Sequence, residues 1–231
     1  MNQCDYKISI AGENSIIIYF GDRSCDKNAA LIADTVNELK ISIGRFIIDY
    51  IPSYASLLVI YDPILTDHDL IKMEIEKSLE NIVFTEPSGD GILVELPVYY
   101  SSESGPDLHN LSKTVGLSAR EVIELHQSID YRVYAMGFAP GFAYLGEVDR
   151  RIAAPRQDTP RLKVPAGSVA IADRQTAVYP CQSPGGWNLI GLCPKTMFDA
   201  AKTPPTPIQV GDRVRFRQVT RREYIALGGE I

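Results

Sequence analysis

The sequence has few of the side chains that most often build a metal centre or a catalytic triad. Among its 231 residues, the three histidines are His68, His109 and His126. The four cysteines are Cys4, Cys25, Cys181 and Cys193. The cysteines are far apart without any C-x-x-C spacing, so neither a zinc site nor a dense disulfide framework is predicted. Three scattered histidines leave little material for a triad, and we expect no metal site formed by this chain alone.

Other absences bear on where the chain works and what it binds. No segment approaches the 18 or more consecutive apolar residues of a membrane span, and the N-terminus lacks the basic and apolar regions of a signal peptide. We therefore expect a cytoplasmic protein that does not bind a membrane. The phosphate-binding patterns G-x-x-x-x-G-K-S/T and G-x-G-x-x-G are also missing, so a complete nucleotide site is not predicted.

Charge is divided unevenly along the chain. Residues 1–98 hold 7 Lys and Arg against 16 Asp and Glu, a net charge of −9. Residues 99–231 hold 16 against 13, a net charge of +3, and the two values add to the total of −6. No concentrated basic face of the kind that nucleic acid requires is indicated. We expect an acidic and a mildly basic unit, and no nucleic-acid partner.

The first half of the sequence predicts a small α+β domain at residues 1–98. Short apolar runs and amphipathic stretches follow one another in the order β-α-β-β-α-β, at residues 15–21, 28–42, 45–52, 56–63, 67–82 and 91–100. In the second helix, the expected buried face consists of Leu70, Met73, Ile75 and Leu79. This order of elements is that of the ferredoxin-like split βαβ fold, which we predict for the domain.

The second half, residues 99–231, predicts a β domain with a short helical lead-in. Helices are expected at residues 105–116 and 117–128, and Ser118 and Glu121 have the spacing of a capping box. His126, on the second helix, is expected to be a packing or surface residue. Short strands broken by glycine and proline then follow at residues 131–136, 168–173, 176–180, 187–191 and 212–219, as in a barrel or a sandwich. In the last strand, Val214 and Phe216 should face the core.

Residues 151–168, RIAAPRQDTPRLKVPAGS, place a proline at every fifth position. Each proline removes a backbone donor and pushes the preceding residue toward an extended conformation, so we predict a stiff loop that is neither a helix nor a regular strand. Arg156 and Arg161 directly follow the first two prolines. An arginine on a stiff chain loses less freedom when it meets a carboxylate or a phosphate. The alternative is a structural ion pair for each arginine, including pairs with the acidic first domain.

Two segments rich in glycine, GFAPGFAYLG (137–146) and SPGGWNLIG (183–191), lie on either side of this loop in the sequence. Turns of this kind can present successive backbone N–H groups to an anion, and aromatic side chains can form the wall of a pocket. The three segments fall within about 55 residues of one another. We therefore predict a shared cleft.

Four long motifs carry a resemblance to a known family. GFAPGFAYLG, PRQDTPRLKVPAGSVAI, YPCQSPGGWNLIG and GDRVRF, in this order, resemble the family of 5-oxoprolinase B subunits, also described as allophanate hydrolase subunit 1-like. The family includes an inhibitor of a sporulation histidine kinase. The resemblance implies a cyclophilin-like β-barrel behind the small α+β domain. It also implies ATP-dependent opening of 5-oxo-L-proline to L-glutamate in a hetero-complex with the C and A subunits of that enzyme, with ATP and Mg²⁺ shared among the chains.

Within this resemblance, the candidate catalytic residues are Arg156, Asp158 and Arg161. The candidate substrate-binding or nucleotide-binding residues are Phe138, Pro140, Gly141, Tyr144, Lys163, Ser168, Ser183, Gly185, Gly186, Trp187 and Asn188. Opening a lactam through a phosphorylated amide involves anionic groups, which arginine forks and backbone donors are suited to hold. We expect Asp158 to orient an arginine.

The sequence departs from the family pattern at three positions. Leu192 and Cys193 stand where arginine and threonine are usual, so one polar contact of the cleft is missing. Lys163 stands where arginine is more usual, and a lysine cannot form the same bidentate fork.

Three other functions compete with an enzyme subunit that is inactive alone. The chain would inhibit a sensor histidine kinase by docking on it, or would be a subunit of an allophanate or urea-type amidohydrolase. A prolyl isomerase is suggested by the barrel type alone, which is a weak argument because one fold supports many functions. The polar cleft motifs favour the first interpretation, an enzyme subunit.

Overall fold

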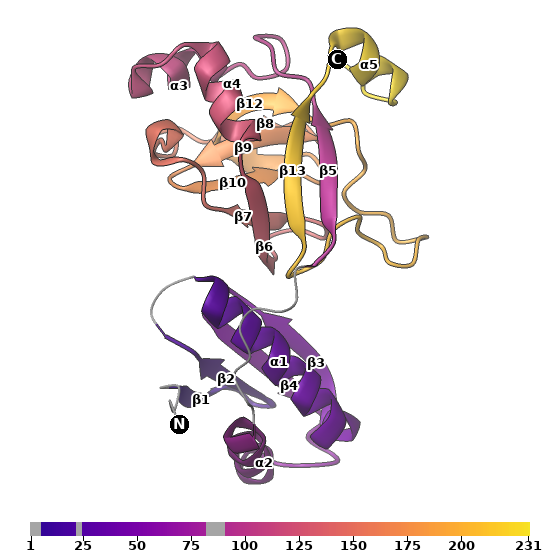
Figure 1. Ribbon diagram of the computed structural model, residues 1–231. Coiled ribbons are helices and arrows are strands. Elements are labelled where there is room, and N and C mark those ends of the chain that lie inside the picture. The colour runs from indigo at the N-terminus through magenta and orange to yellow at the C-terminus, as the bar shows by residue number, and fades with distance from the viewer. Residues whose placement is uncertain (1–5, 22–24, 82–90) are drawn as a thin grey trace. The chain divides into compact units, whose positions relative to one another are not determined.

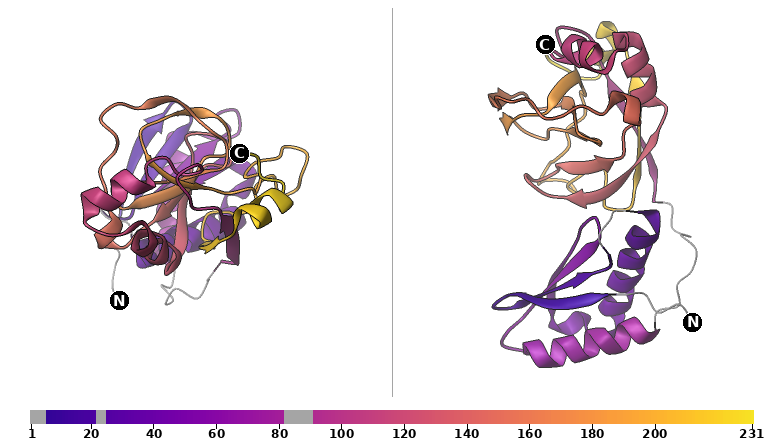
Figure 2. Two further views of the ribbon diagram at one scale, coloured as in Figure 1. Left: turned by 90° about the horizontal axis from the view of Figure 1, so that it is seen from above. Right: turned by 90° about the vertical axis from the view of Figure 1, so that its left-hand side faces the viewer.

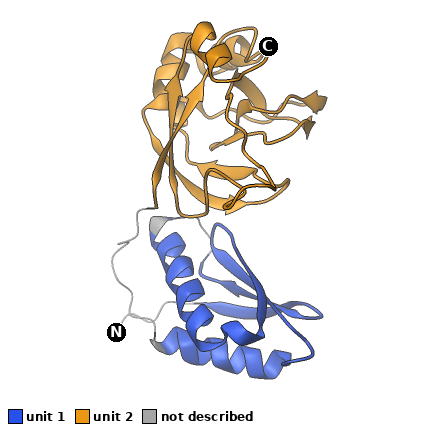
Figure 3. Cartoon of the chain, turned by 90° about the vertical axis from the view of Figure 1, so that its right-hand side faces the viewer, with its two compact units in different colours: residues 1–90 blue, residues 91–231 orange. Residues whose placement is uncertain are grey.

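The structure is a computed structural model that describes residues 6–21, 25–81 and 91–231. The chain separates into two compact units, residues 1–90 and 91–231, which we take in turn (Figure 3). Within the described ranges, no helix is both long and apolar enough to cross a membrane.

The first unit contains a four-stranded antiparallel sheet with the strand order β1-β2-β4-β3 (Figure 1). The strands are β1 (Lys7–Gly12), β2 (Ser15–Tyr19), β3 (Ile47–Pro52) and β4 (Ser56–Tyr61). The helical elements are α1 (Asp26–Ser42), the 3-10 turn η1 (Gly44–Phe46) and α2 (His68–Asn81). Buried and less buried residues alternate along β2 and β4, as expected for a sheet that is covered on one face.

Each helix of the first unit packs one apolar stripe against the sheet. In α1 the buried apolar residues are Leu31, Ile32 and Leu39. In α2 the buried apolar residues are Ile71, Ile75 and Leu79. The prediction was therefore wrong for Leu70 and Met73, which are exposed. Residues spaced by four positions lie on one face of a helix, and Leu70 and Met73 lie beside that face.

The predicted ferredoxin-like order is wrong. Two strands precede α1, and the strand predicted at residues 91–100 is β5 (Leu93–Val98), which pairs in parallel with β13 in the second unit. The first unit therefore has the order β-β-α-β-β-α. The apolar pattern identified β5 as a strand, but periodicity does not name a pairing partner, which here lies 120 residues away.

The second unit is built on a seven-stranded sheet that closes almost completely into a barrel (Figure 2). The strand order is β12-β9-β10-β7-β6-β13-β5. The remaining strands are β6 (Asp130–Met136), β7 (Ala143–Gly146), β9 (Ser168–Ala172), β10 (Gln175–Val178), β12 (Asn188–Leu192) and β13 (Arg213–Gln218). Tyr99, directly after β5, exchanges backbone hydrogen bonds of 2.8 and 3.0 Å with Leu192 of β12, so the last strand meets the first. This closure confirms the predicted barrel.

A two-stranded ribbon, β8 (Arg161–Val164) and β11 (Ser183–Gly185), extends from the wall of the barrel (Figures 2 and 3). The prediction of a loop throughout residues 151–168 is therefore wrong for the four residues of β8. Pro160 and Pro165 flank β8 without entering it, so the strand keeps all its donors. A 3-10 turn, η2 (Arg150–Ile152), precedes the proline-rich segment.

Three helices accompany the barrel, namely α3 (Leu108–Val115), α4 (Ala119–Gln127) and α5 (Arg221–Ala226). The predicted capping box is confirmed, because the Ser118 hydroxyl accepts from the Glu121 amide and the Glu121 carboxylate accepts from the Ser118 amide. Val214 and Phe216 of β13 are buried as predicted. On the outer face of that strand, Arg215 donates to both carboxylate oxygens of Asp130 at 2.6 Å.

His126 is fully buried in the second unit, which confirms that it is a packing residue. Its Nδ1 lies 2.8 Å from the Tyr100 hydroxyl, and its Nε2 lies 2.9 Å from the Thr176 hydroxyl. The ring stacks on Phe216 with 4.5 Å between the ring centroids. Burial lowers the pKa of His126 from 6.5 to about 3, so the ring is neutral at physiological pH.

Acidification is expected to destabilise the second unit through His126. The unfolded chain binds a proton on this ring below about pH 6.5, whereas the folded unit binds it only near pH 3, so stability falls as the pH falls between these values. From pH 7 to pH 5 the loss is about 2 kcal/mol, at about 1.4 kcal/mol per pH unit. Urea unfolding at both pH values, followed by the fluorescence of the single tryptophan Trp187, measures it.

His126→Gln is expected to remove this pH dependence while lowering stability at pH 7, because the stacked ring is lost. His109→Gln is the matched control, since His109 is an exposed histidine on α3. An unchanged slope in His126→Gln would refute the assignment.

Candidate active site

The turn between β6 and β7 carries the first predicted cleft motif. Gly141 has a φ of 82°, and a Cβ added to it would lie 2.5 Å from the carbonyl oxygen of Met197, so only glycine fits. Phe142 follows and is buried. Its ring packs edge-on against Tyr144 and Trp187, at centroid distances of 5.0 and 5.8 Å. The two glycine-rich motifs therefore come together as predicted, in a packed aromatic cluster where a cleft was expected.

Arg156 lies at the exposed side of this cluster. Its guanidinium carbon is 5.8 Å from the centroid of the Trp187 ring. Within the described parts of the chain, the side chain forms no ion pair and is exposed to solvent. A cation–π contact at an exposed site contributes about 0.5–1 kcal/mol. The contact orients the guanidinium and leaves its N–H groups available to an anion.

Arg161 is held by a carboxylate of its own unit. Its Nη2 donates to Asp107 Oδ1 at 2.6 Å, and the side chain of Asp107 is 6% exposed against 33% for Arg161. The other carboxylate oxygen accepts from the Leu189 amide at 2.8 Å. The partner of Arg161 is therefore not in the acidic first unit. Sequence reasoning gave Asp107 no role, because a lone aspartate near a helix start has many explanations.

Tyr179, which the sequence analysis also missed, is buried, and its hydroxyl lies against the ribbon strand β11. A Cβ added to Gly185 would lie 2.3 Å from the Tyr179 hydroxyl oxygen, so Gly185 is required for this close approach. Burial raises the pKa of Tyr179, and the charges of Arg156 and Arg161 act in the opposite direction. The hydroxyl therefore lies within the field of both arginines. A tyrosine at the end of an apolar strand gave no signal beyond core packing.

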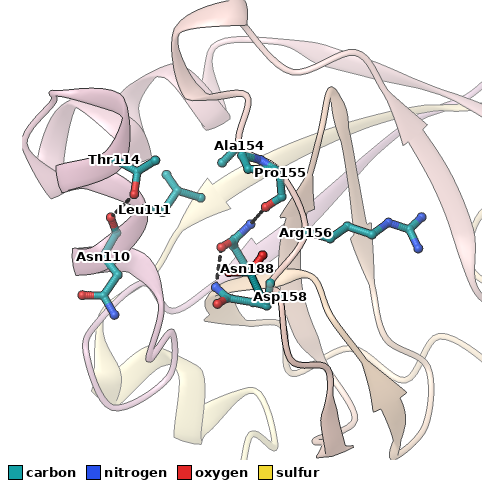
Figure 4. Close-up of a pocket in the computed structure, with 9 residues that line it drawn as sticks. Asn110, Leu111, Thr114, Ala154, Pro155, Arg156, Asp158 and Asn188 are labelled. Carbon is teal, nitrogen blue, oxygen red and sulfur yellow. Dashed lines mark hydrogen bonds between the residues drawn. The ribbon is translucent and has the colours of Figure 1, made fainter.

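Asn188 has a structural role beside a shallow pocket (Figure 4). Its amide nitrogen donates to the carbonyls of Pro155 and Ile171 at 2.9 and 3.1 Å, and its oxygen accepts from Gln157 at 2.6 Å. The backbone N–H of Gln157 in turn donates to the Gly186 carbonyl at 2.7 Å. These bonds fix the loop that carries Arg156.

The pocket has a volume of about 220 Å³ and lies between α3 and this loop. Its lining consists of Asn110, Leu111, Thr114, Ala154, Pro155, Arg156, Gln157, Asp158 and Asn188. Figure 4 shows the Arg156 guanidinium directed away from α3 and from Asn110. The loop therefore separates the pocket from the aromatic cluster.

The other predicted site residues divide into an exposed and a buried group. The exposed group is Phe138, Pro140, Asp158 and Lys163. The buried hydroxyls are those of Ser168 and Ser183, and among the described residues neither has a hydrogen-bond partner. Ser168 alternates along β9 with residues that face the barrel core, so it lies on the cluster side of the strand. These two serines are thus not presented to solvent.

The departures at residues 192 and 193 lie inside the fold. Leu192 forms the bridge to Tyr99 that closes the barrel. Cys193 is buried, and burial raises the pKa of its thiol to about 11, so it is protonated at neutral pH. Neither residue supplies charge to the cleft.

The arrangement is suited to hold anions on one side of an apolar wall. Arg156 and Arg161 supply the positive charge, and the aromatic cluster supplies the wall. In the described ranges, no group of three or more His, Cys, Asp or Glu residues is placed to bind a metal ion. Within the described residues, the carboxylate that contacts these arginines is Asp107, which is already paired with Arg161 and accepts from the Leu189 amide.

Comparison with known sequences gives a consistent result. Residues 6–208 match the family described as "Carboxyltransferase domain, subdomain C and D". The chain is 37% identical to the B subunit of 5-oxoprolinase from Bacillus subtilis over 231 residues, which cover 96% of each protein. It is 48% identical to the B subunit of 5-oxoprolinase from Escherichia coli O157:H7 over 123 residues, which cover 53% of this chain and 56% of the relative.

Solved structures show the same fold in longer chains. The crystal structure of TTHA0988 matches 89% of this chain with a TM-score of 0.77 and 34% identity. This chain covers only 40% of that chain. The urea carboxylase of Kluyveromyces lactis shares the fold, with a TM-score of 0.74 at 16% identity, over 96% of this chain and 22% of the carboxylase.

Proposed function

The chain belongs to the carboxyltransferase subdomain C and D family and, within it, to the 5-oxoprolinase B subunits, and on that premise we propose that it is one component of an ATP-dependent 5-oxoprolinase. The proposed reaction hydrolyses 5-oxo-L-proline to L-glutamate with cleavage of ATP. The observation that carries the proposal is the match with the Bacillus subtilis protein over nearly the whole of both chains. As part of this proposal, the barrel of the second unit is of the cyclophilin-like type. The protein is also proposed to work in the cytoplasm.

The site residues suit an anionic lactam and its phosphorylated form. Arg156, stacked on Trp187, binds the substrate carboxylate or a phosphoryl group with its free N–H groups. Arg161, positioned by Asp107, supplies a second guanidinium from the ribbon strand β8, and Lys163 adds a further charge on the same face of that strand. The aromatic cluster excludes water from one wall.

ATP and Mg²⁺ are proposed to be shared with partner subunits. The positively charged side chains of this chain are suited to bind the phosphates of ATP. A phosphoryl group from ATP would activate the amide oxygen of the lactam. In this proposal the ligands of Mg²⁺ come from the nucleotide and from another chain. The C and A subunits of 5-oxoprolinase are the proposed partners, and this chain provides half of the site.

Two alternatives make different demands on the chain. A regulator that inhibits a sensor histidine kinase would need no cations beside a water-excluding wall. A component of an allophanate or urea-type amidohydrolase would use the same wall for a smaller substrate that lacks the carboxylate of 5-oxoproline. The whole-length match to a 5-oxoprolinase component favours the lactam.

The isolated chain is expected to be inactive, and ATP hydrolysis that depends on 5-oxoproline should appear only when the A and C subunits are added. The reason is that the described residues form an anion-binding wall without a complete phosphate-binding loop. ATP turnover is measured for the chain alone, for each pair of proteins and for the full set. Comparable turnover by the lone chain would contradict the proposal, as would urea-dependent turnover without 5-oxoproline-dependent turnover.

A further inference from the structure

Tyr179 places a hydroxyl group at the edge of the aromatic cluster. Its ring is buried and packs edge-on against Phe142, with 5.4 Å between the ring centroids. The ring reaches the ribbon, because a Cβ added to Gly185 would meet the Tyr179 hydroxyl oxygen at 2.3 Å. Gly185 is only half-buried, so the hydroxyl end of the ring lies where the cluster meets the ribbon.

The Tyr179 hydroxyl has no hydrogen-bond partner among the described residues, whereas a buried tyrosine usually finds one. The other buried tyrosines of residues 91–231 follow the rule. Tyr100 and Tyr131 bond to the ring and to the backbone of His126, both at 2.8 Å, and Tyr224 bonds to a backbone carbonyl at 3.0 Å. Core packing alone therefore does not explain why residue 179 carries a hydroxyl.

Backbone contacts bring the chain at both arginines to this hydroxyl. Gly185 is the antiparallel partner of Arg161 in the ribbon. The next residue, Gly186, accepts a hydrogen bond of 2.7 Å from the backbone N–H of the residue that follows Arg156. The charges of both arginines act on the Tyr179 hydroxyl, but burial has the larger effect and raises its pKa. The hydroxyl therefore keeps its proton at neutral pH and is a donor beside two positive charges.

We propose that the Tyr179 hydroxyl is a further substrate-binding group of this site, which donates a hydrogen bond to the anionic group that Arg156 binds. The inference rests on the proposed function for the identity of that anion, a carboxylate or a phosphoryl group. It assigns a ligand contact to a residue otherwise explained by packing. Gly185 is then the residue that leaves room for the hydroxyl.

The chemistry around the hydroxyl selects an anionic ligand. A cation would be repelled by Arg156 and Arg161, and an apolar ligand would leave the hydroxyl without an acceptor. The oxygen atoms of a carboxylate or a phosphoryl group can accept from a phenol and from a guanidinium at the same time. Hydrogen bonds to an ionised acceptor are about twice as strong as those between neutral groups, so the contact should contribute measurably to affinity.

The test is a titration of the full chain, alone and with the proposed A and C subunits, with 5-oxo-L-proline and inorganic phosphate as separate probes. Trp187 fluorescence reports binding, since Arg156 lies over its ring. Tyr179→Phe should weaken the dissociation constant of at least one probe about tenfold. The probe that responds identifies the bound group as a carboxylate or a phosphoryl group. The melting temperature should stay the same or rise, because the lost hydroxyl has no partner among the described residues.

Tyr131→Phe is the matched control. The Tyr131 hydroxyl is buried in the same unit but already donates to the His126 carbonyl. This change should therefore lower the melting temperature and leave both dissociation constants unchanged. If Tyr179→Phe gave the same pattern as Tyr131→Phe, the Tyr179 hydroxyl would serve only the fold and the proposal would be wrong.

Gly185→Ala tests the position of the hydroxyl separately. The added Cβ would meet the hydroxyl oxygen at 2.3 Å but the ring carbon that bears it at 3.0 Å. The change should therefore weaken binding and lower the melting temperature. Adding Tyr179→Phe to the same chain should restore part of the melting temperature but not the binding. A double variant no more stable than Gly185→Ala would contradict this position.

Dissociation constants within twofold of normal for both probes in Tyr179→Phe would overturn the proposal, and so would a failure of the unmodified protein to bind either probe with its partners present. ATP hydrolysis is measured separately. Normal 5-oxoproline-dependent turnover by Tyr179→Phe would refute the hydroxyl contact and leave the proposed function intact. Anion binding that Tyr179→Phe weakens, in a set of proteins without such turnover, would support the contact and refute the proposed function.

Discussion

Arg156→Ala is expected to lower 5-oxoproline-dependent ATP hydrolysis by the assembled enzyme about a hundredfold, with little change in melting temperature. The guanidinium is exposed and its one described contact is the face of Trp187, so its removal costs the fold little. Loss of a bidentate bond to a carboxylate or phosphoryl group costs about 2.7 kcal/mol of transition-state stabilisation, which corresponds to two decades in rate. Steady-state kinetics and a thermal melt of the same preparation measure both quantities.

The conservative change and a control make this result specific. Arg156→Lys keeps the charge without the fork and should lose about tenfold. Arg45→Ala is the matched control, because Arg45 also lies over an aromatic ring, 4.5 Å from the centroid of Phe46, but in the first unit. Normal turnover by Arg156→Ala at full assembly would show that the arginine does not bind the reacting groups.

Asp107→Ala is expected to destabilise the second unit by about 3 kcal/mol. The change leaves the Leu189 amide without its acceptor and Arg161 without its counter-charge, and the carboxylate that it removes is almost wholly buried. Urea unfolding followed by Trp187 fluorescence reports on this unit alone, since the chain has no other tryptophan. The same variant should also lower turnover, because Arg161 loses the group that positions it.

Asp199→Ala provides the control for Asp107→Ala. Asp199 also accepts from a backbone amide, that of Ala201, and pairs with a cation, Lys202, but its side chain is 37% exposed and that of Lys202 is 70% exposed. We expect a loss below about 1 kcal/mol there. A double-mutant cycle of Asp107→Ala with Arg161→Ala separates the ion pair from the bond to Leu189. Equal effects at Asp107 and Asp199 would mean that burial does not strengthen the buried contact.

Much of the second unit could be predicted from its sequence because the signals are local. The capping box of α4 lies within four residues. The alternation of buried and more exposed residues along β13 requires only a strand with one face in solvent. The meeting of the two glycine-rich motifs was predicted for a similar reason, since each places aromatic residues beside glycines that turns require, although a cleft was expected and a packed cluster is found. The ribbon strand β8 was missed because three nearby prolines argued against a strand, although none lies within it.

The parts that could not be predicted depend on contacts between distant residues. The sequence analysis placed β5 in the first unit although it belongs to the barrel, because an apolar run does not indicate which strand it pairs with. Asp107 was missed for the same reason, because its partner Arg161 lies 54 residues away. Ser168 and Ser183 were assigned to the cleft from their motifs alone, and the structure places their hydroxyls away from solvent.

The pairing of β5 with β13 affects folding during synthesis as well as the final structure. The described pairings of the first unit join residues between 7 and 61, so that unit can fold while synthesis continues. The barrel cannot fold so early, because β5 has no β13 to pair with until the chain has been synthesised as far as Gln218, about 120 residues later. Until then its apolar residues Leu96 and Val98 have no sheet partner on that side. The interval before β13 emerges is therefore the period in which the nascent chain is most exposed to aggregation and to capture by chaperones.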